Sequence, residues 1–306
     1  MMGTTALLLS LAVAQSSPYV RSHVDKDDSS TQCLFWTTPT LTWNLSSVGN
    51  PESVDEQKQR EFAAIRASFQ SWQRIFEDCG NLRFSEGPLL DERRVGYVQK
   101  EENHNLVLFR SRRCQEIAPA ADKCWAEETC GNVYDCWDSD DRTIALTLTT
   151  YDERSGIIYD SDIQLNASGF VFTTVSSPPC AQPISSKTPN CVATDVQNTM
   201  THELGHLVGL DHTWLSSSVM YPQAPSGEVS KRIIDAGSRD FVCRAYPKGL
   251  ASQSCLTPTL NASSPGDTSL ALGRQVAGCS TTGGAPWLSA LAALSWLGWR
   301  RRGVRS

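Results

Sequence analysis

Hydrophobic and polar residues alternate early in the chain and then recur at helical spacing. Leu41, Trp43 and Leu45 alternate with polar residues, which predicts a half-buried strand. Ser53 and Glu56 have the spacing of a capping box, which predicts the start of a helix. The apolar residues that follow recur every three or four positions: Phe62, Ile65, Phe69, Trp72 and Phe76. These patterns predict a strand followed by an amphipathic helix that packs on a sheet.

Further apolar stretches predict four more strands, at residues 82–84, 106–109, 144–149 and 157–165. A last helix is expected within residues 230–246, because apolar residues recur there before Pro247. The hydrophobic content of 40% over 306 residues is enough for one ample core. We therefore expect one folded domain with extensions at both ends.

One motif carries candidate metal chemistry, His-Glu-Leu-Gly-His-Leu-Val-Gly-Leu-Asp-His. On a helix, His202 and His206 are four residues apart and project from the same face. Gly209 can end that helix with a positive φ, and the chain can then bring His212 to the same place. Three neutral imidazoles suit Zn²⁺, which in catalytic sites takes three protein ligands and leaves one position for water. Glu203 follows the first ligand and is the candidate base.

Together with a methionine further on, this motif resembles the signature of the metzincin metalloproteases. Met220 lies eight residues after His212, in Ser-Val-Met-Tyr-Pro, as in the methionine turn of that clan. Thr213 and the Met-Tyr-Pro run are most similar to the matrixin branch. The resemblance covers residues 33–247 and implies an α+β zincin fold. That fold has a twisted, mostly parallel five-stranded sheet with an antiparallel edge strand, about three helices, and a small subdomain after the zinc helix.

The resemblance implies a zinc-dependent endopeptidase that acts on proteins or peptides. His202, His206 and His212 would hold Zn²⁺, while Glu203 would take a proton from a bound water and return it to the leaving amine. Met220 would form a hydrophobic floor under the metal without coordinating it.

The strand at residues 144–149 would, by the same resemblance, form the edge of the sheet beside the metal. Its residues Ile144, Ala145, Leu146 and Thr147 would pair with an extended substrate through backbone hydrogen bonds.

Two other functions share this scaffold. A surface adhesin or binding module would keep the fold without the chemistry, and the presence of all three histidines and the glutamate argues against it. A zinc amidase acting on cell-wall peptides would keep the metal and change the substrate, and only substrate profiling separates it from an endopeptidase.

The start of the chain has the pattern of a secretory signal. Residues 4–14 are apolar but too few to span a bilayer, and Ala12-Val13-Ala14 has the form of a cleavage site, although no Lys or Arg precedes the run. We expect a signal peptide over residues 1–14 and a polar leader over 15–32. The alternative is a buried N-terminal strand.

Eleven cysteines fit an exported protein. Cys279 stands apart in the tail, and the other ten are an even number, which predicts disulfides in an oxidising compartment. Cys180 and Cys191 are close enough to form a local pair, and the other pairings stay open. None has CxxC spacing, which disfavours a structural zinc knuckle.

The end of the chain has the pattern of a membrane-sorting tail. Residues 248–278 are rich in Ser, Thr, Pro and Gly and are expected to be a flexible linker. Residues 279–306 then combine Cys279, an apolar segment and an arginine cluster, an order that resembles the C-terminal sorting tail of myxobacterial surface proteins. By that resemblance Cys279 is the processing or lipid-attachment point of a sorting protease. The alternative is an ordinary tail anchor with an unmodified thiol.

These features place the protein at the cell surface or outer envelope of a bacterium, in membrane contact through its C-terminal segment or released after tail processing. The net charge of −6, without a basic and aromatic stripe, argues against a nucleic-acid surface. The acidic residues Asp138, Asp140 and Asp141 are candidates for Ca²⁺, but their spacing favours a solvated turn.

Latency is the last feature that the sequence addresses. The chain lacks the cysteine-bearing prosegment motif that keeps vertebrate matrixins latent. Only 18 residues separate a cut after Ala14 from Cys33, too few for a folded propeptide domain. Any latency must therefore arise differently.

Overall fold

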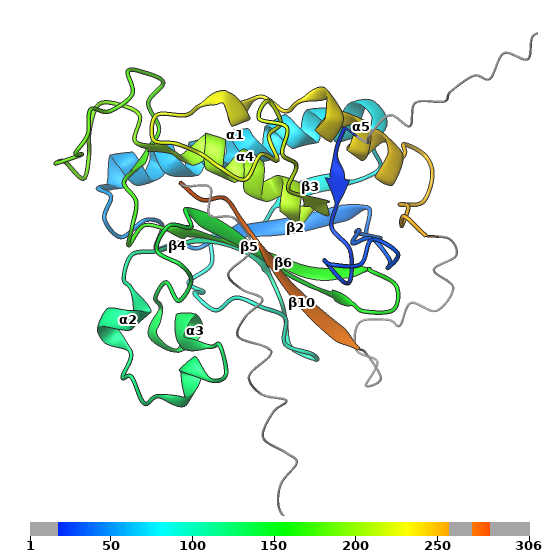
Figure 1. Cartoon of the computed structure of the whole chain (residues 1–306), viewed down its shortest axis with the longest axis horizontal. Helices are drawn as coiled ribbons and strands as arrows, with labels where there is room; N and C mark the ends of the chain where they lie inside the picture. The colour runs from blue at the N-terminus through cyan, green and yellow to red at the C-terminus, as the bar shows by residue number, and fades with distance from the viewer. Residues whose placement is uncertain (1–17, 257–270, 282–306) are drawn as a thin grey trace, which may run out of the picture.

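The computed structural model describes residues 18–256 and 271–281. One six-stranded sheet forms the centre of the fold, with helices α1 and α4 over one face and the short helices α2 and α3 on its other side (Figure 1). The strands are β1 (Val20–Arg21), β2 (Thr40–Leu45), β3 (Arg83–Glu86), β4 (Asn105–Arg110), β5 (Ala145–Asp152), β6 (Ile158–Asn166), β7 (Phe172–Thr173), β8 (Thr194–Asp195), β9 (Leu210–Asp211) and β10 (Leu272–Ala277). The helices are α1 (Asp55–Cys79), α2 (Cys114–Ile117), α3 (Cys130–Tyr134), α4 (Val196–Leu207) and α5 (Ala236–Ala245), with 3₁₀ turns η1 (Lys123–Trp125) and η2 (Ser230–Arg232).

The main sheet has the strand order β10-β5-β6-β4-β2-β3. Strands β3, β2, β4 and β6 run parallel, and β5 pairs with β6 in the antiparallel sense. The α+β class and a sheet of mixed direction agree with the expectation from the sequence. The sixth strand, β10, was not expected.

Strand β10 lies within the stretch that was expected to be a linker. It runs antiparallel to β5, from Leu272 opposite Asp152 to Ala277 opposite Thr147, and Figure 1 draws it in orange beside that strand. Six residues between Ser- and Gly-rich stretches carry little strand signal of their own. The strand forms because the outer edge of β5 offers unpaired backbone groups that it satisfies.

Helix α1 buries the apolar stripe that its sequence predicts. Its aromatic residues pack on the sheet, where the ring of Phe69 stacks on Trp43 with centroids 3.7 Å apart. The expected capping box is wrong, since Val54 is the N-cap and no side chain caps the helix. The Ser53 hydroxyl instead donates to the Glu61 carboxylate, at 2.6 Å, because that buried acid needs donors more than the exposed helix end does.

Ten cysteines form five disulfides, and Cys279 is the free one. The local pair Cys180–Cys191 agrees with the sequence. Cys33–Cys255 and Cys79–Cys243 join distant parts of the chain, while Cys114–Cys136 and Cys124–Cys130 tie the loop that holds α2 and α3. Disulfides of this number are typical of exported proteins.

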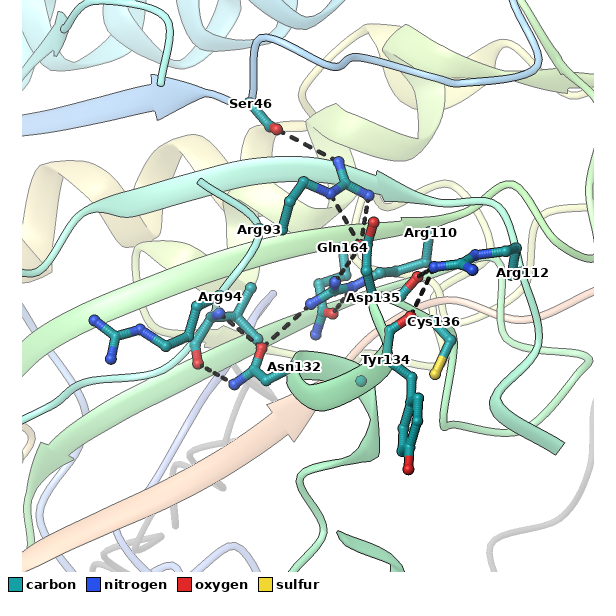
Figure 2. A network of polar contacts seen from close by, with 12 residues as sticks. Ser46, Arg93, Arg94, Arg110, Arg112, Asn132, Tyr134, Asp135, Cys136 and Gln164 are labelled. Atoms are coloured by element: carbon teal, nitrogen blue, oxygen red, sulfur yellow. Dashed lines mark hydrogen bonds and ion pairs between the residues drawn. The ribbon is translucent and has the colours of Figure 1, made fainter. Parts of the chain in front are cut away.

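A polar network attaches this disulfide-tied loop to the sheet (Figure 2). Arg110 of β4 is fully buried and donates to the Asp135 carboxylate at 2.6 Å and to the Gln164 side chain at 2.9 Å. Arg93 donates to the same carboxylate at 2.9 Å. Burial lowers the pKa of Arg110, and the paired carboxylate compensates the buried charge.

In residues 18–256 and 271–281, no helix is long and apolar enough to cross a membrane. The expected signal peptide and the apolar part of the expected sorting tail lie outside the described residues.

Candidate active site

Helix α4 carries the first two histidines through the centre of the protein. Its N-cap, Asp195, accepts a hydrogen bond from the backbone N–H of Asn198 at 2.7 Å. Arg232 donates to the same carboxylate at 2.8 Å and fixes its orientation. On the far side, the indole N–H of Trp72 in α1 donates to the carbonyl of Thr201 at 2.9 Å. The helix is therefore held at its start and along its side.

The chain leaves α4 at Gly209, which has a φ of +97°. A Cβ there would overlap the carbonyl oxygen of Leu34, so both the dihedral angle and the space require glycine. Strand β9 follows, pairs with β1, and brings His212 back towards the helix. The Nε2 atoms of His202, His206 and His212 consequently lie 3.1–3.2 Å from one another.

Hydrogen bonds to carbonyl groups orient these rings. Nδ1 of His202 donates to the carbonyl of Val219 at 2.6 Å, and Nδ1 of His206 donates to the carbonyl of Leu210 at 2.8 Å. A carbonyl only accepts, so Nδ1 carries the proton and the lone pair of Nε2 points to the centre. Burial lowers the pKa of all three rings, and for His202 and His212 repulsion between the rings adds to this effect. The rings are therefore neutral.

This donor set fits zinc. Three lone pairs that face each other have no donor among them, which is unfavourable unless a cation lies between them. Tetrahedral Zn–N bonds of about 2.0–2.1 Å place ligand nitrogens about 3.3–3.4 Å apart, close to the observed spacing.

Met220 packs beneath the second histidine's turn of helix. A Cβ at Gly205 would overlap its sulfur, so the glycine between the two ligands leaves the space that Met220 fills. The carboxylate of Asp235 holds this methionine turn by accepting from the Ser218 hydroxyl and the Val219 N–H, both at 2.9 Å. Sequence reasoning missed Asp235 and Gly205, because both act through contacts distant in the chain.

Glu203 is fully buried beside the three rings. Its Oε2 accepts from the Thr147 hydroxyl at 2.8 Å, and its Oε1 accepts from the backbone N–H of Cys279 at 3.3 Å. Burial raises the pKa of Glu203 to about 8, and these hydrogen bonds oppose that rise. The hydroxyl of Thr147 is a contact that the sequence did not indicate, although the residue itself was expected beside the substrate.

The sequence profile of the matrixin family, peptidase family M10, matches residues 35–237. This chain belongs to the matrixin family. No curated protein matches it. Membership makes it a zinc metallopeptidase of the metzincin type, whose substrates are proteins or peptides.

In this matrixin the expected substrate strand already has a partner. Ala145, Leu146 and Thr147 lie in β5, which pairs with β10 over most of its length, and the N–H of Ile144 donates to the carbonyl of Cys279 at 2.9 Å. Cys279, which the sequence assigned to an anchor, is 1% exposed and lies beside His202 and Glu203.

The expected calcium ligands of the matrixin lie apart from this site and have protein partners. Asp138 accepts from the N–H of Gly131 at 2.7 Å, Asp140 pairs with Arg142, and Asp141 pairs with Arg113. These contacts give Ca²⁺ no support.

Proposed function

We propose that this matrixin is an exported zinc endopeptidase of the cell envelope, with Glu203 as its general base. The observation that carries the catalytic part is the convergence of three neutral imidazoles beside a fully buried carboxylate. A binding module would have no need of that carboxylate, because its burial is unfavourable and none of the cationic side chains in the described residues pairs with it.

The three histidines, His202, His206 and His212, are the residues that would hold zinc. When bound, the ion acts as a Lewis acid that polarises a carbonyl and lowers the pKa of a water. The carbonyl groups of Val219 and Leu210 keep two of the rings in the tautomer that a ligand needs. Met220 fills the space below them and excludes water from that side.

Glu203 supplies the proton transfer. In its ionised form the carboxylate accepts a proton from water, and in its neutral form it donates that proton to the departing amine. Burial raises the pKa of Glu203 above its ordinary value, which favours its return of the proton to the amine. The Thr147 hydroxyl holds Oε2, and Oε1, which accepts from the Cys279 N–H in this structure, would make the transfer once residues 271–281 leave the site.

The proposed peptide-binding backbone flanks this carboxylate. Ile144 lies just before β5 and Thr147 lies within it, and the N–H and C=O groups on the outer side of β5, which pair with β10 here, suit an extended peptide by strand addition. Residues 222–224 follow the methionine turn and offer a second line of backbone groups.

The test compares Glu203→Gln with the chain that keeps glutamate. Since residues 271–281 lie against the site, the assay is run both on the natural chain and on Cys279→Ala. In the Cys279→Ala background, Glu203→Gln should bind the same amount of zinc and hydrolyse casein at least about a hundredfold more slowly, because the proton acceptor is lost. Glu127→Gln is the matched control, because this surface glutamate contacts only exposed Lys123. Near-normal hydrolysis by the Glu203→Gln chain would remove Glu203 from the mechanism.

Export and anchoring are proposed on other grounds. Five disulfides and the apolar start of the chain support export, and the apolar, arginine-ended tail supports retention at a bacterial envelope after recognition by a sorting protease. In the folded chain the Cys279 thiol is buried, so its lipidation or processing requires that residue to leave the site. Membrane fractionation of cells, with mass analysis of the mature C-terminus, tests this proposal. An unprocessed chain in the soluble fraction would contradict it.

A further inference from the structure

Residues 271–281, here called the tail segment, lie where a peptide substrate would be expected to lie. Strand β10 covers the outer edge of β5 in the antiparallel sense. The backbone then continues past the three histidines, with the carbonyl of Cys279 accepting from the N–H of Ile144 at 2.9 Å. The edge that the proposed function needs is thus occupied by the chain itself.

The tail segment is also held from the opposite side. The N–H of Ser280 donates to the carbonyl of Pro222 at 2.9 Å, and the carbonyl of Ser280 accepts from the N–H of Ala224 at 3.0 Å. Ser280 therefore lies between Thr143, to which it runs antiparallel, and Gln223, to which it runs parallel. Two-sided backbone pairing is how an extended peptide is recognised without regard to its sequence.

Gly278 allows this close approach. A Cβ at this position would overlap the carbonyl oxygen of Ala145 in the edge strand. Only glycine lets the backbone come near enough to place the next residue over the site. The carbonyl of Gly278 also interacts with the ring of His212, so the tail segment reaches a second histidine of the zinc site.

Cys279 lies at one side of the zinc site, beside His202 and Glu203. Its sulfur, a ring nitrogen of His202 and a carboxylate oxygen of Glu203 all lie within 4.8 Å of one another. Its thiol lies beside the Glu203 carboxylate, and its backbone N–H donates to that carboxylate at 3.3 Å. It is the one free cysteine beside ten that form disulfides, and thiolate is a strong zinc ligand.

We propose that the tail segment is a built-in inhibitor, bound as a peptide would be, with the Cys279 thiolate as the fourth protein ligand of the zinc. This proposal rests on the zinc site of the proposed function. On ligation the thiol loses its proton to water or to the neighbouring Glu203 carboxylate, and a sulfur lone pair forms the bond to the metal. The thiolate then fills the position that water needs.

The covalent link between the tail segment and the enzyme body favours this inhibition. Residues 257–270 join the tail segment to the enzyme body, so its binding is intramolecular and is favoured by effective concentration. A cut within residues 257–270 would make the tail segment a separate peptide that can dissociate. Activation by proteolysis at this site follows from the topology.

Two variants of the full chain test the proposal by independent routes. Cys279→Ala removes the ligand, and Gly278→Val keeps the thiol but prevents the backbone from approaching Ala145. Val276→Thr is the control, because its side chain in β10 is half exposed and threonine keeps the shape and the strand preference. We expect both test variants to hydrolyse casein at least about tenfold faster than the natural chain, and the control to stay latent.

X-ray absorption at the zinc edge supplies a readout that does not depend on activity. The natural chain and Val276→Thr should show one sulfur at about 2.3 Å with nitrogen at about 2.0–2.1 Å, and Cys279→Ala and Gly278→Val should show no sulfur. The proposal would be overturned if the natural chain showed no zinc-bound sulfur. It would also be overturned if the natural chain hydrolysed casein measurably and the two test variants hydrolysed it at the same rate. Zinc-bound sulfur in the natural chain with no hydrolysis by any variant would support thiolate ligation and contradict the peptidase function instead.

Discussion

Replacing Glu203 with glutamine should stabilise the metal-free protein, and the gain should grow as the pH rises. The carboxylate is fully buried without a cationic side chain, so burial raises its pKa from the ordinary value of 4.5 to about 8. The folded state therefore binds more protons than the unfolded state between these values, and the free energy of unfolding falls as the pH rises through that window. Glutamine keeps the shape and cannot ionise.

The expected size follows from the two pKa values. The pKa of Glu203 rises from 4.5 in the unfolded state to about 8 in the folded state. At about 1.4 kcal/mol per pH unit, this difference lowers the unfolding free energy of the natural chain by about 5 kcal/mol between pH 4 and pH 9. The difference in unfolding free energy between Glu203→Gln and the natural chain should change by that amount across this range. Titrating groups distant from Glu203 cancel in the comparison, because they are the same in both chains and do not interact with it.

Urea unfolding of the chelator-treated proteins at pH 4 and pH 9, with the disulfides intact, measures this quantity. A parallel pH dependence in the two chains, within about 1 kcal/mol, would refute the reasoning. In that case the buried Glu203 carboxylate would not lower the unfolding free energy at high pH, and its raised pKa would lose its physical support.

Two other positions give predictions of different kinds. Gly209→Ala should lower the unfolding free energy by about 2–4 kcal/mol and weaken zinc binding, because alanine disfavours positive φ and its Cβ would overlap Leu34. Competition with a chromogenic chelator measures the zinc affinity, and an affinity equal to that of the natural chain would contradict this prediction. Asp160→Asn should raise the melting temperature relative to the natural chain at pH 7 but not at pH 4. Asp160 and Asp162 are both buried in β6. Burial and the nearby Asp162 carboxylate raise the pKa of Asp160, and burial raises the pKa of Asp162 to about 6. The natural chain therefore loses stability as both groups ionise with rising pH. A melting-temperature difference that does not vary with pH would exclude this account.

The features that the sequence predicted well have local causes. The four-residue spacing of His202 and His206 and the glycine turn at Gly209 depend on neighbours within about one helical turn. Their geometry is a property of the backbone, so the pattern was sufficient to predict the convergence of the three rings.

The features that the sequence did not predict depend on distant partners. Ser53 does not cap the helix, because its hydroxyl donates a hydrogen bond to the buried carboxylate of Glu61, eight residues later. Strand β10 forms against β5, more than a hundred residues earlier in the chain. The same holds for Cys279, whose contact with Glu203 spans 76 positions, while the residues around it carry only the signals of a membrane tail.

The disulfide between Cys33 and Cys255 closes the enzyme body into a covalent loop. Cys255 stands immediately before residues 257–270, so peptide-bond breakage in that interval falls outside the loop. Every strand of the sheet except β10, both zinc-site turns and the other four disulfides lie inside it. A cut within residues 257–270 would separate the tail segment from the enzyme body, while the part of the fold that positions the histidines would keep all five disulfides.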